Sequence, residues 1–446
     1  MFENLLGQGE AVSALKSDIE RGRLAPAILL AGPAGSGKLT AALEAARALS
    51  CEAAAKGDDV YRGLAAWNCP CPACARHRLL VHPDLLLLGP RTFPEEIQAG
   101  LELLGRAPGP ASAYFFARAA RKLARRFDAA LYEGEETRLA KAAPLLRELE
   151  ELLDAVAPER AAAGSLAPGA AEAAAKAAAI AAKLEAFVPD APPVFMIRNV
   201  ETWARLAPMG SRKVAVIENA DRMQESARNA LLKVLEEPPD SARFILLSSR
   251  RSAVMGTVLS RTRAYSFKRR GAEETALVVE RIFKSAEPAA SVEDYLAARR
   301  PFPPAEARER AREFLAAGLA ARSDAGRLAP PLDAIARLAA RGGASPAGGG
   351  GADALAQALA RLGDATKDFG QKDDRLEGSF RAFLEALCSI LSDILREEGL
   401  DARGTALVAR VASLARSALS ERESLNRNAS TLAESLLYAI SSEGSA

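Results

Sequence analysis

The sequence lacks the features that would place the chain in a membrane, in the secretory pathway or on nucleic acid through a general basic charge. No apolar run approaches the ~18 residues that are needed to span a bilayer. The first residues, MFENLLGQGE, have no basic segment followed by an apolar one, which is not the pattern of a secretory signal. The formal net charge is only +2, so any contact with DNA must come from a local patch or a larger assembly. We therefore expect a cytoplasmic protein with no membrane partner.

Cysteine is scarce as well, and its distribution is uneven. The chain has five cysteines, and four of them fall in one stretch: Cys51, Cys69, Cys71 and Cys74. In a chain without an export signal such a cluster indicates a metal site rather than disulfides, and four thiolates suit one tetrahedral Zn²⁺. The single residue between the second and third cysteines strains this arrangement, which leaves His77 as an alternative ligand and a lost site with free thiols as the alternative interpretation. Cys388 lies on an apolar helical face and is predicted to be core.

The length of 446 residues predicts two to four domains, and the pattern of apolar runs predicts their type. Four short runs are typical of buried parallel strands, at 27–32, 85–88, 214–218 and 244–248. Helical patterns separate them, such as the amphipathic stretch 224–237. Strands that alternate with helices indicate an α/β fold with a parallel sheet.

The remainder of the chain is helical in pattern. Residues 92–190 are rich in Ala, Leu, Glu, Arg and Lys, which predicts a helical insertion; the alternative is a partly disordered Ala-rich loop. No convincing strand follows Phe267. We predict an α/β domain at 1–268, with a cysteine module at about 51–78 and the insertion at about 92–190. A helical lid at 269–341, a glycine-rich linker at 342–351 and a C-terminal helical domain at 352–446 follow.

A glycine-rich loop after the first strand has the pattern of a phosphate-binding loop. Its glycines allow backbone N–H groups to surround phosphate oxygens, and the lysine reaches the β- and γ-phosphates. A serine or threonine should follow the lysine to bind Mg²⁺, but leucine stands there, and the next threonine is rotated by ~100° around the helix. The pattern predicts ATP binding but argues against Mg²⁺-assisted hydrolysis. The candidate nucleotide-binding residues here are Gly32, Gly35, Ser36, Gly37, Lys38, Leu39 and Thr40.

The strand 214–218 ends in a second acidic motif that is also incomplete. Glu218 occupies the position of an acid in the Mg²⁺ shell, and we predict it to be part of the nucleotide site. Asn219 stands where an active ATPase has a glutamate that activates water, and an amide is a poor general base. Asp221 is predicted to cap the helix that begins near Gln224. We expect the chain to hydrolyse ATP weakly or not at all by itself.

Several segments together resemble the bacterial DNA polymerase III clamp-loader family, a group of AAA+ proteins. The run from Asn229 to Pro239 is the most specific of them, and the segment 217–223, IENADRM, is closer to the delta-prime subunit than to gamma/tau. Thr262 departs from the family, which usually has cysteine there. The segments that carry the resemblance are 5–8, 32–38, 82–84, 229–239 and 257–262.

The resemblance implies a role inside a hetero-pentamer with gamma/tau and delta subunits, which loads the sliding clamp onto primed DNA. It implies a lid and a C-terminal collar, a zinc module at the cysteines, and an arginine finger at Arg261, donated to ATP on a neighbouring subunit. A solvated surface arginine is the alternative for Arg261. Ser248 or Ser249 stands at the family's polar sensor position, or simply ends a strand.

Other functions stay open at this point. A gamma/tau-like ATPase subunit, a stand-alone AAA+ DNA-remodelling ATPase and a nucleotide-independent scaffold all share the fold. The insertion also carries a basic run, which is either a solvated helix face or a contact for DNA or a partner. Its members are Arg118, Arg121, Lys122, Arg125 and Arg126.

Overall fold

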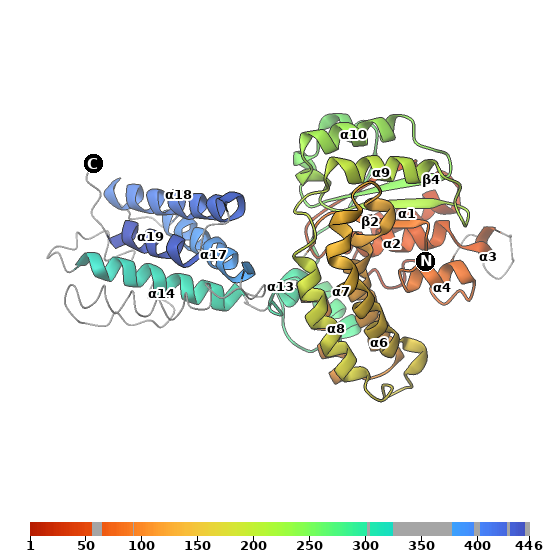
Figure 1. Cartoon of the computed structure of the whole chain (residues 1–446), viewed down its shortest axis with the longest axis horizontal. Helices are drawn as coiled ribbons and strands as arrows, with labels where there is room; N and C mark the ends of the chain where they lie inside the picture. The colour runs from red at the N-terminus through yellow and green to blue at the C-terminus, as the bar shows by residue number, and fades with distance from the viewer. Residues whose placement is uncertain are drawn as a thin grey trace. The chain divides into compact units, whose positions relative to one another are not determined.

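A computed structural model of the chain gives the structure (Figure 1). It describes residues 1–55, 65–91, 93–300, 304–323, 377–396, 402–425 and 429–441. Internal contacts divide the chain into two units, Met1–Leu296 and Ala297–Ala446, and each is considered by itself. The predicted linker 342–351 lies outside the described residues.

A five-stranded, wholly parallel sheet forms the centre of the first unit, in the order β2-β3-β4-β1-β5. Its strands are β1 (Ala27–Ala31), β2 (Leu85–Leu88), β3 (Lys213–Ile217), β4 (Ala242–Ser248) and β5 (Arg263–Ser266). The α/β class and the four predicted strands are confirmed. β5 was not predicted, because Tyr265 is its only buried residue and only the neighbouring β1 pairs with it.

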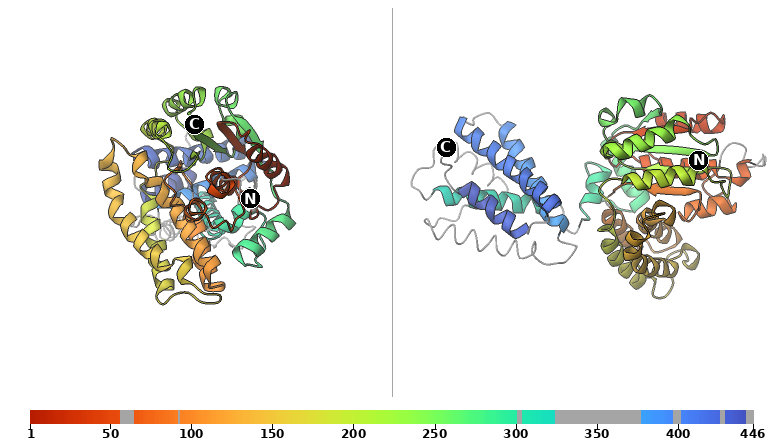
Figure 2. Two further views of the ribbon diagram at one scale, coloured as in Figure 1. Left: turned by 90° about the vertical axis from the view of Figure 1, so that its right-hand side faces the viewer. Right: turned by 45° about the horizontal axis from the view of Figure 1, so that its top comes forward.

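Helices cover both faces of this sheet, which explains why its inner strands are continuous apolar runs. α1 (Gly9–Glu20) and α2 (Lys38–Leu49) pack on the face that carries Ile28, Leu30 and Val216. α9 (Val194–Arg205) and α10 (Glu225–Glu236) pack on the face that carries Leu29, Phe244 and Leu246 (Figures 1 and 2). Two short helices follow α2, and they are α3 (Glu52–Ala55) and α4 (Pro72–Arg78).

The helical insertion, which extends away from the sheet in Figure 1, is confirmed, and it has four long helices. They are α5 (Pro94–Arg106), α6 (Pro110–Ala124), α7 (Glu136–Ala155) and α8 (Ala170–Glu185). Two short 3₁₀ turns, η2 (Arg125–Phe127) and η3 (Ala129–Leu131), follow α6. Phe116 and Leu149 belong to the same buried cluster as Leu88 of the sheet. The insertion is therefore an integral part of the core of this unit rather than an Ala-rich loop.

The helices before and after β5 belong to the first unit up to Leu296, and the later ones belong to the second. α11 (Gly256–Leu259) precedes β5, and α12 (Ala272–Phe283) and α13 (Val292–Ala297) follow it. Phe283 of α12 contacts Phe115 of the insertion and Tyr295 of α13, with ring centroids 5.4 and 4.7 Å apart. The boundary between the units thus falls inside the range predicted for the lid, and the limits of the lid and collar domains stay predictions.

The second unit is a group of helices around its own apolar core. Its described helices are α14 (Pro304–Ser323), α17 (Glu377–Arg396), α18 (Ala402–Leu425) and α19 (Ala429–Ser441). The predicted apolar face of α17 is buried, as Phe380 and Leu387 illustrate, and Cys388 is half-buried beside this core. No helix in the described parts of the chain is long and apolar enough to cross a membrane.

Candidate nucleotide and metal sites

The phosphate loop lies between the carboxyl end of β1 and the first turn of α2, and two of its glycines are required by geometry. Gly37 has φ 94°, and a Cβ there would lie 2.5 Å from Leu5 Cδ1. Gly35 has φ 68°, and its Cβ would lie 3.0 Å from the backbone nitrogen of Glu293. A side chain at either position would be strained and would collide with its neighbour. Leu5 of the N-terminal segment and Glu293 of α13 therefore lie close to the loop at these two glycines.

The polar side chains of the loop are bonded to the loop itself. Lys38 Nζ donates hydrogen bonds to the carbonyl oxygens of Gly32 and Pro33, both at 2.6 Å, and Ser36 Oγ donates to Pro33 at 2.7 Å. Burial lowers the pKa of Lys38 to about 8, and Glu218 is the nearby charge that opposes this most. Arg270, after β5, also donates to the carbonyl oxygens of Leu6 and Gly35.

The two residues after Lys38 lie in different surroundings, as the helical rotation requires. Leu39 is 5% exposed and packs in the core between the sheet, α1 and α2. Thr40 is exposed. The position that would carry the Mg²⁺-binding hydroxyl is therefore part of the apolar core.

Glu218 follows β3 directly, and two arginines neutralise its carboxylate. Arg91 Nη1 lies 3.3 Å from Glu218 Oε2, and Arg126 Nη2 donates to Oε1 of the same carboxylate. Arg91 follows β2, whereas Arg126 comes from the insertion and lies over the ring of Phe93. The Glu218 side chain is 9% exposed and that of Arg126 is 2% exposed. Glu218, which the sequence predicts to be an acid in the Mg²⁺ shell, is therefore held in buried ion pairs.

The ion pairs continue from Arg91 into the insertion. Arg91 Nη2 donates to Glu96 Oε2 of α5 at 2.8 Å, and Lys122 of α6 donates to Glu96 Oε1. Burial alone would raise the pKa of Glu96, but Lys122 and Arg91 together hold it at about 2. Burial lowers the pKa of Lys122 to about 8. Buried charges persist only when they are paired, so the five side chains form one interdependent group.

Asn219 and Asp221 have structural partners. Asn219 has φ 53°, and its Nδ2 donates to the carbonyl oxygen of Pro90 at 2.6 Å. The predicted helix cap at Asp221 is wrong: its carboxylate accepts hydrogen bonds from Ser248 Oγ at 2.8 Å and Arg250 Nε at 3.2 Å. Ser248 therefore joins the ends of β3 and β4, and the neighbouring Ser249 is half-buried.

Arg261 lies on the surface between α11 and β5. Its Nη2 donates to Glu236 Oε1 at 2.8 Å, and its Nη1 donates to the carbonyl oxygen of Thr257 at 3.0 Å. Glu236 is the last residue of α10 and belongs to the run 229–239. An exposed ion pair of this kind contributes only ~0–1 kcal/mol, so a stronger anion would displace Glu236.

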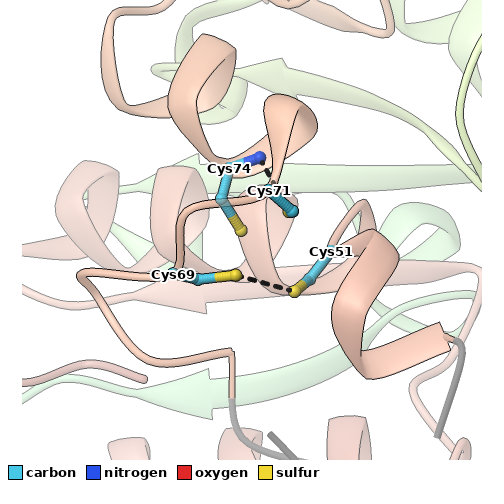
Figure 3. A group of neighbouring side chains, drawn as sticks. All are labelled: Cys51, Cys69, Cys71 and Cys74. Atoms are coloured by element: carbon cyan, nitrogen blue, oxygen red, sulfur yellow. Dashed lines mark hydrogen bonds between the residues drawn. The ribbon is translucent and has the colours of Figure 1, made fainter. Parts of the chain in front are cut away.

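The four clustered cysteines come together at the end of α2 and the start of α4 (Figure 3). Their sulfur atoms all lie within 4.8 Å of one another, and Cys51 Sγ lies 3.8 Å from Cys69 Sγ. A tetrahedral ion with metal–sulfur bonds of about 2.3 Å sets its ligands roughly 3.8 Å apart. The backbone N–H of Cys74 donates to Cys71 Sγ at 3.4 Å. The donor set therefore fits a metal ion despite the short spacing between Cys69 and Cys71.

A buried arginine supports this group from α2. Arg47 Nη1 donates to Cys74 Sγ at 3.1 Å, and Arg47 Nη2 pairs with Glu44 at 2.6 Å. A hydrogen bond from Cys74 is the main reason that the pKa of Cys51 is lowered, to about 5, while the pKa of Cys74 is raised. His77 is not a member of the group. Its ring stacks on His82 with centroids 4.1 Å apart, so the alternative ligand is not supported.

The motif His82-Pro83-Asp84 forms a turn before β2. His82 Nδ1 accepts a hydrogen bond from the backbone N–H of Asp84 at 3.1 Å. The Asp84 carboxylate accepts from the backbone N–H groups of Met209 and Gly210, at 3.1 and 2.7 Å. The motif therefore fixes the segment that leads into β3.

The basic run of the insertion faces the protein, so its interpretation as a solvated helix face is wrong, and a contact with DNA or a partner stays a prediction. Arg118 Nη1 donates to the carbonyl oxygens of His77 and Arg78 at the end of α4. Each of the others has an acidic partner: Arg121 with Glu150, Lys122 with Glu96, Arg125 with Asp128, and Arg126 with Glu218.

The sequence alone did not identify the residues that surround Glu218 and the cysteines. Arg91 and Arg126 lie 127 and 92 residues from Glu218, and no spacing rule connects them. The only available signal was the density of basic residues around Arg126. Arg47 gave no signal, because a lone arginine in a helix is normally exposed.

Comparison with known proteins gives matches to DNA polymerase III subunits. A family model described as DNA polymerase III, delta subunit, matches residues 7–105 and 194–270. The delta' subunit of Pseudomonas aeruginosa is 36% identical over 91 residues, which cover 20% of this chain and 27% of that protein. The delta' subunit of Haemophilus influenzae is 34% identical over 74 residues, or 16% of this chain and 23% of that protein. The tau subunit of Bacillus subtilis is 36% identical over 74 residues, which cover 16% of this chain and 13% of that protein.

These matches span about a quarter or less of the curated relatives. Among solved structures, a gamma subunit-related protein of Thermotoga maritima aligns with 59% of this chain and 89% of its own, at 16% identity and a TM-score of 0.25.

The ion-pair group predicts an acid-sensitive stability. The pKa of Glu96 is depressed in the folded state, so its contribution is complete above pH ~4.5 and is lost as the pH falls toward 2. We expect protonation of Glu96 to lower the free energy of unfolding by about 2 kcal/mol between pH 6 and pH 3. Urea unfolding of Glu96→Gln should lack this part of the pH dependence, whereas the exposed Glu172→Gln should retain it. Parallel pH profiles for wild type and Glu96→Gln would contradict the assignment.

Proposed function

The chain belongs to the family of DNA polymerase III clamp-loader subunits and is delta-prime-like, and from this membership we propose that it acts as the delta-prime-type subunit of a clamp loader. It would stand with gamma/tau and delta subunits in a cytoplasmic hetero-pentamer that loads the sliding clamp onto primed DNA. The observation that carries the proposal is a contrast within one chain. Its own acidic residue, Glu218, is held in ion pairs, while Arg261 lies exposed with a weakly held guanidinium.

The chain's own ATP hydrolysis is weak or absent in this proposal. Hydrolysis of this type requires a hydroxyl and an acid around Mg²⁺ and a base that activates water. Leu39 is core, Glu218 is paired with two arginines, and the Asn219 amide is bonded to Pro90. The phosphate loop itself is retained, and its backbone N–H groups suit the polyphosphate of ATP.

The catalytic contribution is made to a neighbour. Arg261 would place its planar guanidinium against the γ-phosphate of ATP held by an adjacent gamma/tau subunit, where it stabilises charge on the phosphate oxygens. Residues 269–341 would serve as the lid, and the helices of 352–446 as the collar that joins the subunits.

We further propose that Cys51, Cys69, Cys71 and Cys74 hold a structural Zn²⁺. Such an ion supplies only cross-linking, because four thiolates leave no open coordination position. The four cysteines would join the end of α2 to α4, and Arg47 neutralises part of the negative charge of the thiolates.

A gamma/tau-like ATPase subunit is the second candidate, because the tau subunit of Bacillus subtilis matches with the same identity as a delta' subunit. The two candidates differ in the isolated chain. A gamma/tau-like subunit hydrolyses ATP by itself, and a delta-prime-type subunit does not.

We predict that Arg261→Ala lowers the clamp- and DNA-stimulated ATPase of a reconstituted loader by about tenfold or more, because one site loses its finger. Arg205→Ala removes another exposed arginine that pairs with a glutamate and should leave the rate unchanged. Glu236→Ala frees Arg261 and should also retain the rate.

Equal rates for wild type and Arg261→Ala would refute the finger assignment. ATPase activity of the isolated chain that Lys38→Ala abolishes would instead favour the gamma/tau-like candidate.

For the cysteines we expect one zinc per chain by elemental analysis of protein purified without chelator. Cys51→Ser and Cys74→Ser should each lower the bound zinc and the thermal stability, because a structural zinc contributes directly to folding. Cys388→Ser is the matched control and should change neither. Wild-type protein without zinc would exclude the site.

A further inference from the structure

The residues at the phosphate loop do not fit the divalent cation that P-loop ATPases use. Mg²⁺ is held in such proteins by oxygen ligands in near-octahedral geometry, usually a hydroxyl and one or two carboxylates. Here the hydroxyl position is the buried Leu39, and the nearest acid of the motif, Glu218, already has a guanidinium on each oxygen. The donor set is therefore incomplete in both of its parts.

The charges around Glu218 oppose a further cation. Arg91, Arg126 and Lys122 carry three positive charges against the two carboxylates of Glu218 and Glu96, and Lys38 is a further cation nearby. In a buried site like charges within a few ångström repel strongly, because water does not screen them. A divalent ion at Glu218 would have to displace an arginine that is itself buried.

The insertion is built to keep Arg126 in place. Arg126 belongs to the turn η2 that follows α6, and its guanidinium lies 5.5 Å from the centroid of the Phe93 ring. Its neighbour Arg125 donates to the carbonyl oxygens of His82 and Leu85, which fixes this turn against β2. Phe127 of the same turn is buried and stacks on Tyr132.

The family model matches the segment that contains Glu218 but not the segment that contains Arg126. Glu218 lies inside the matched residues 194–270, whereas Arg126 lies between the two matched segments. The cation that neutralises the acid of the motif thus comes from a part of the chain that the family model does not match.

We propose that Arg126, with Arg91, permanently takes the place of the divalent cation at Glu218, so that the phosphate loop binds phosphate anions without metal. The insertion is then a lock on the acidic residue rather than a surface for DNA. This inference concerns the isolated chain and does not depend on the proposed role in clamp loading. Failure of the Arg261 experiment would leave it unaffected.

The test uses the full chain and measures melting temperature with ATPγS as the phosphate ligand, with and without added Mn²⁺. We expect ATPγS to raise the melting temperature of the wild type, and by the same amount in both conditions. Absence of any shift would contradict binding of phosphate by the loop. Electron paramagnetic resonance should find no Mn²⁺ held by the protein beyond that carried by the nucleotide. A larger shift in Mn²⁺ that Glu218→Gln removes would overturn the proposal.

The variants test the pair itself. Arg126→Met should lower the melting temperature by roughly 5 °C or more, because it leaves a buried carboxylate with one partner fewer. Combining it with Glu218→Gln should recover much of the loss, since the remaining groups carry no unpaired negative charge. Arg138→Met, at an exposed arginine of the same insertion, is the control and should have little effect.

Arg126→Lys keeps a cation at the site and serves if Arg126→Met does not fold. It should melt within a few degrees of the wild type. An Arg126→Met protein as stable as the Arg138→Met control, or a double variant less stable than both single variants, would contradict the proposed lock.

Discussion

The pairing of Glu218 with Arg91 and Arg126 is the interaction on which the first unit depends. A carboxylate at the end of a buried strand is unfavourable unless cations accompany it. Here one cation comes from the segment after β2 and the other from the insertion, so the ion pair joins three parts of the chain. Removing any member would leave a charge in the interior, which is far more costly than never having placed the pair there.

This constraint acts at the edge of the sheet that carries the phosphate loop. The phosphate loop, the end of β3 and the end of β4 meet at one edge of the sheet because parallel strands all end on the same side. The backbone geometry there is maintained, as the positive φ of Gly37 shows. The polar side chains, however, form hydrogen bonds within the protein: Lys38 donates to a carbonyl oxygen of the loop, and Ser248 donates to Asp221.

Much of this architecture could be predicted from the sequence, because local patterns determine it. Apolar runs identified four strands, helix propensity identified the insertion, and the clustering of the cysteines identified the four thiols that come together. Pairings between distant segments could not be predicted. β5 is a strand only because β1 lies beside it, Asp221 bonds to β4 rather than to its own helix, and Arg126 finds Glu218 across 92 residues. The basic run is predicted to be exposed because the sequence gives no sign of the acidic residues that pair with it.

A crystal of the chain grown with ATPγS and Mn²⁺ tests the central claim most directly, through anomalous scattering at the manganese edge. The account predicts no manganese peak at Glu218, with Arg91 and Arg126 still on its carboxylate. A manganese ion coordinated by Glu218, with Arg126 turned away, would contradict it.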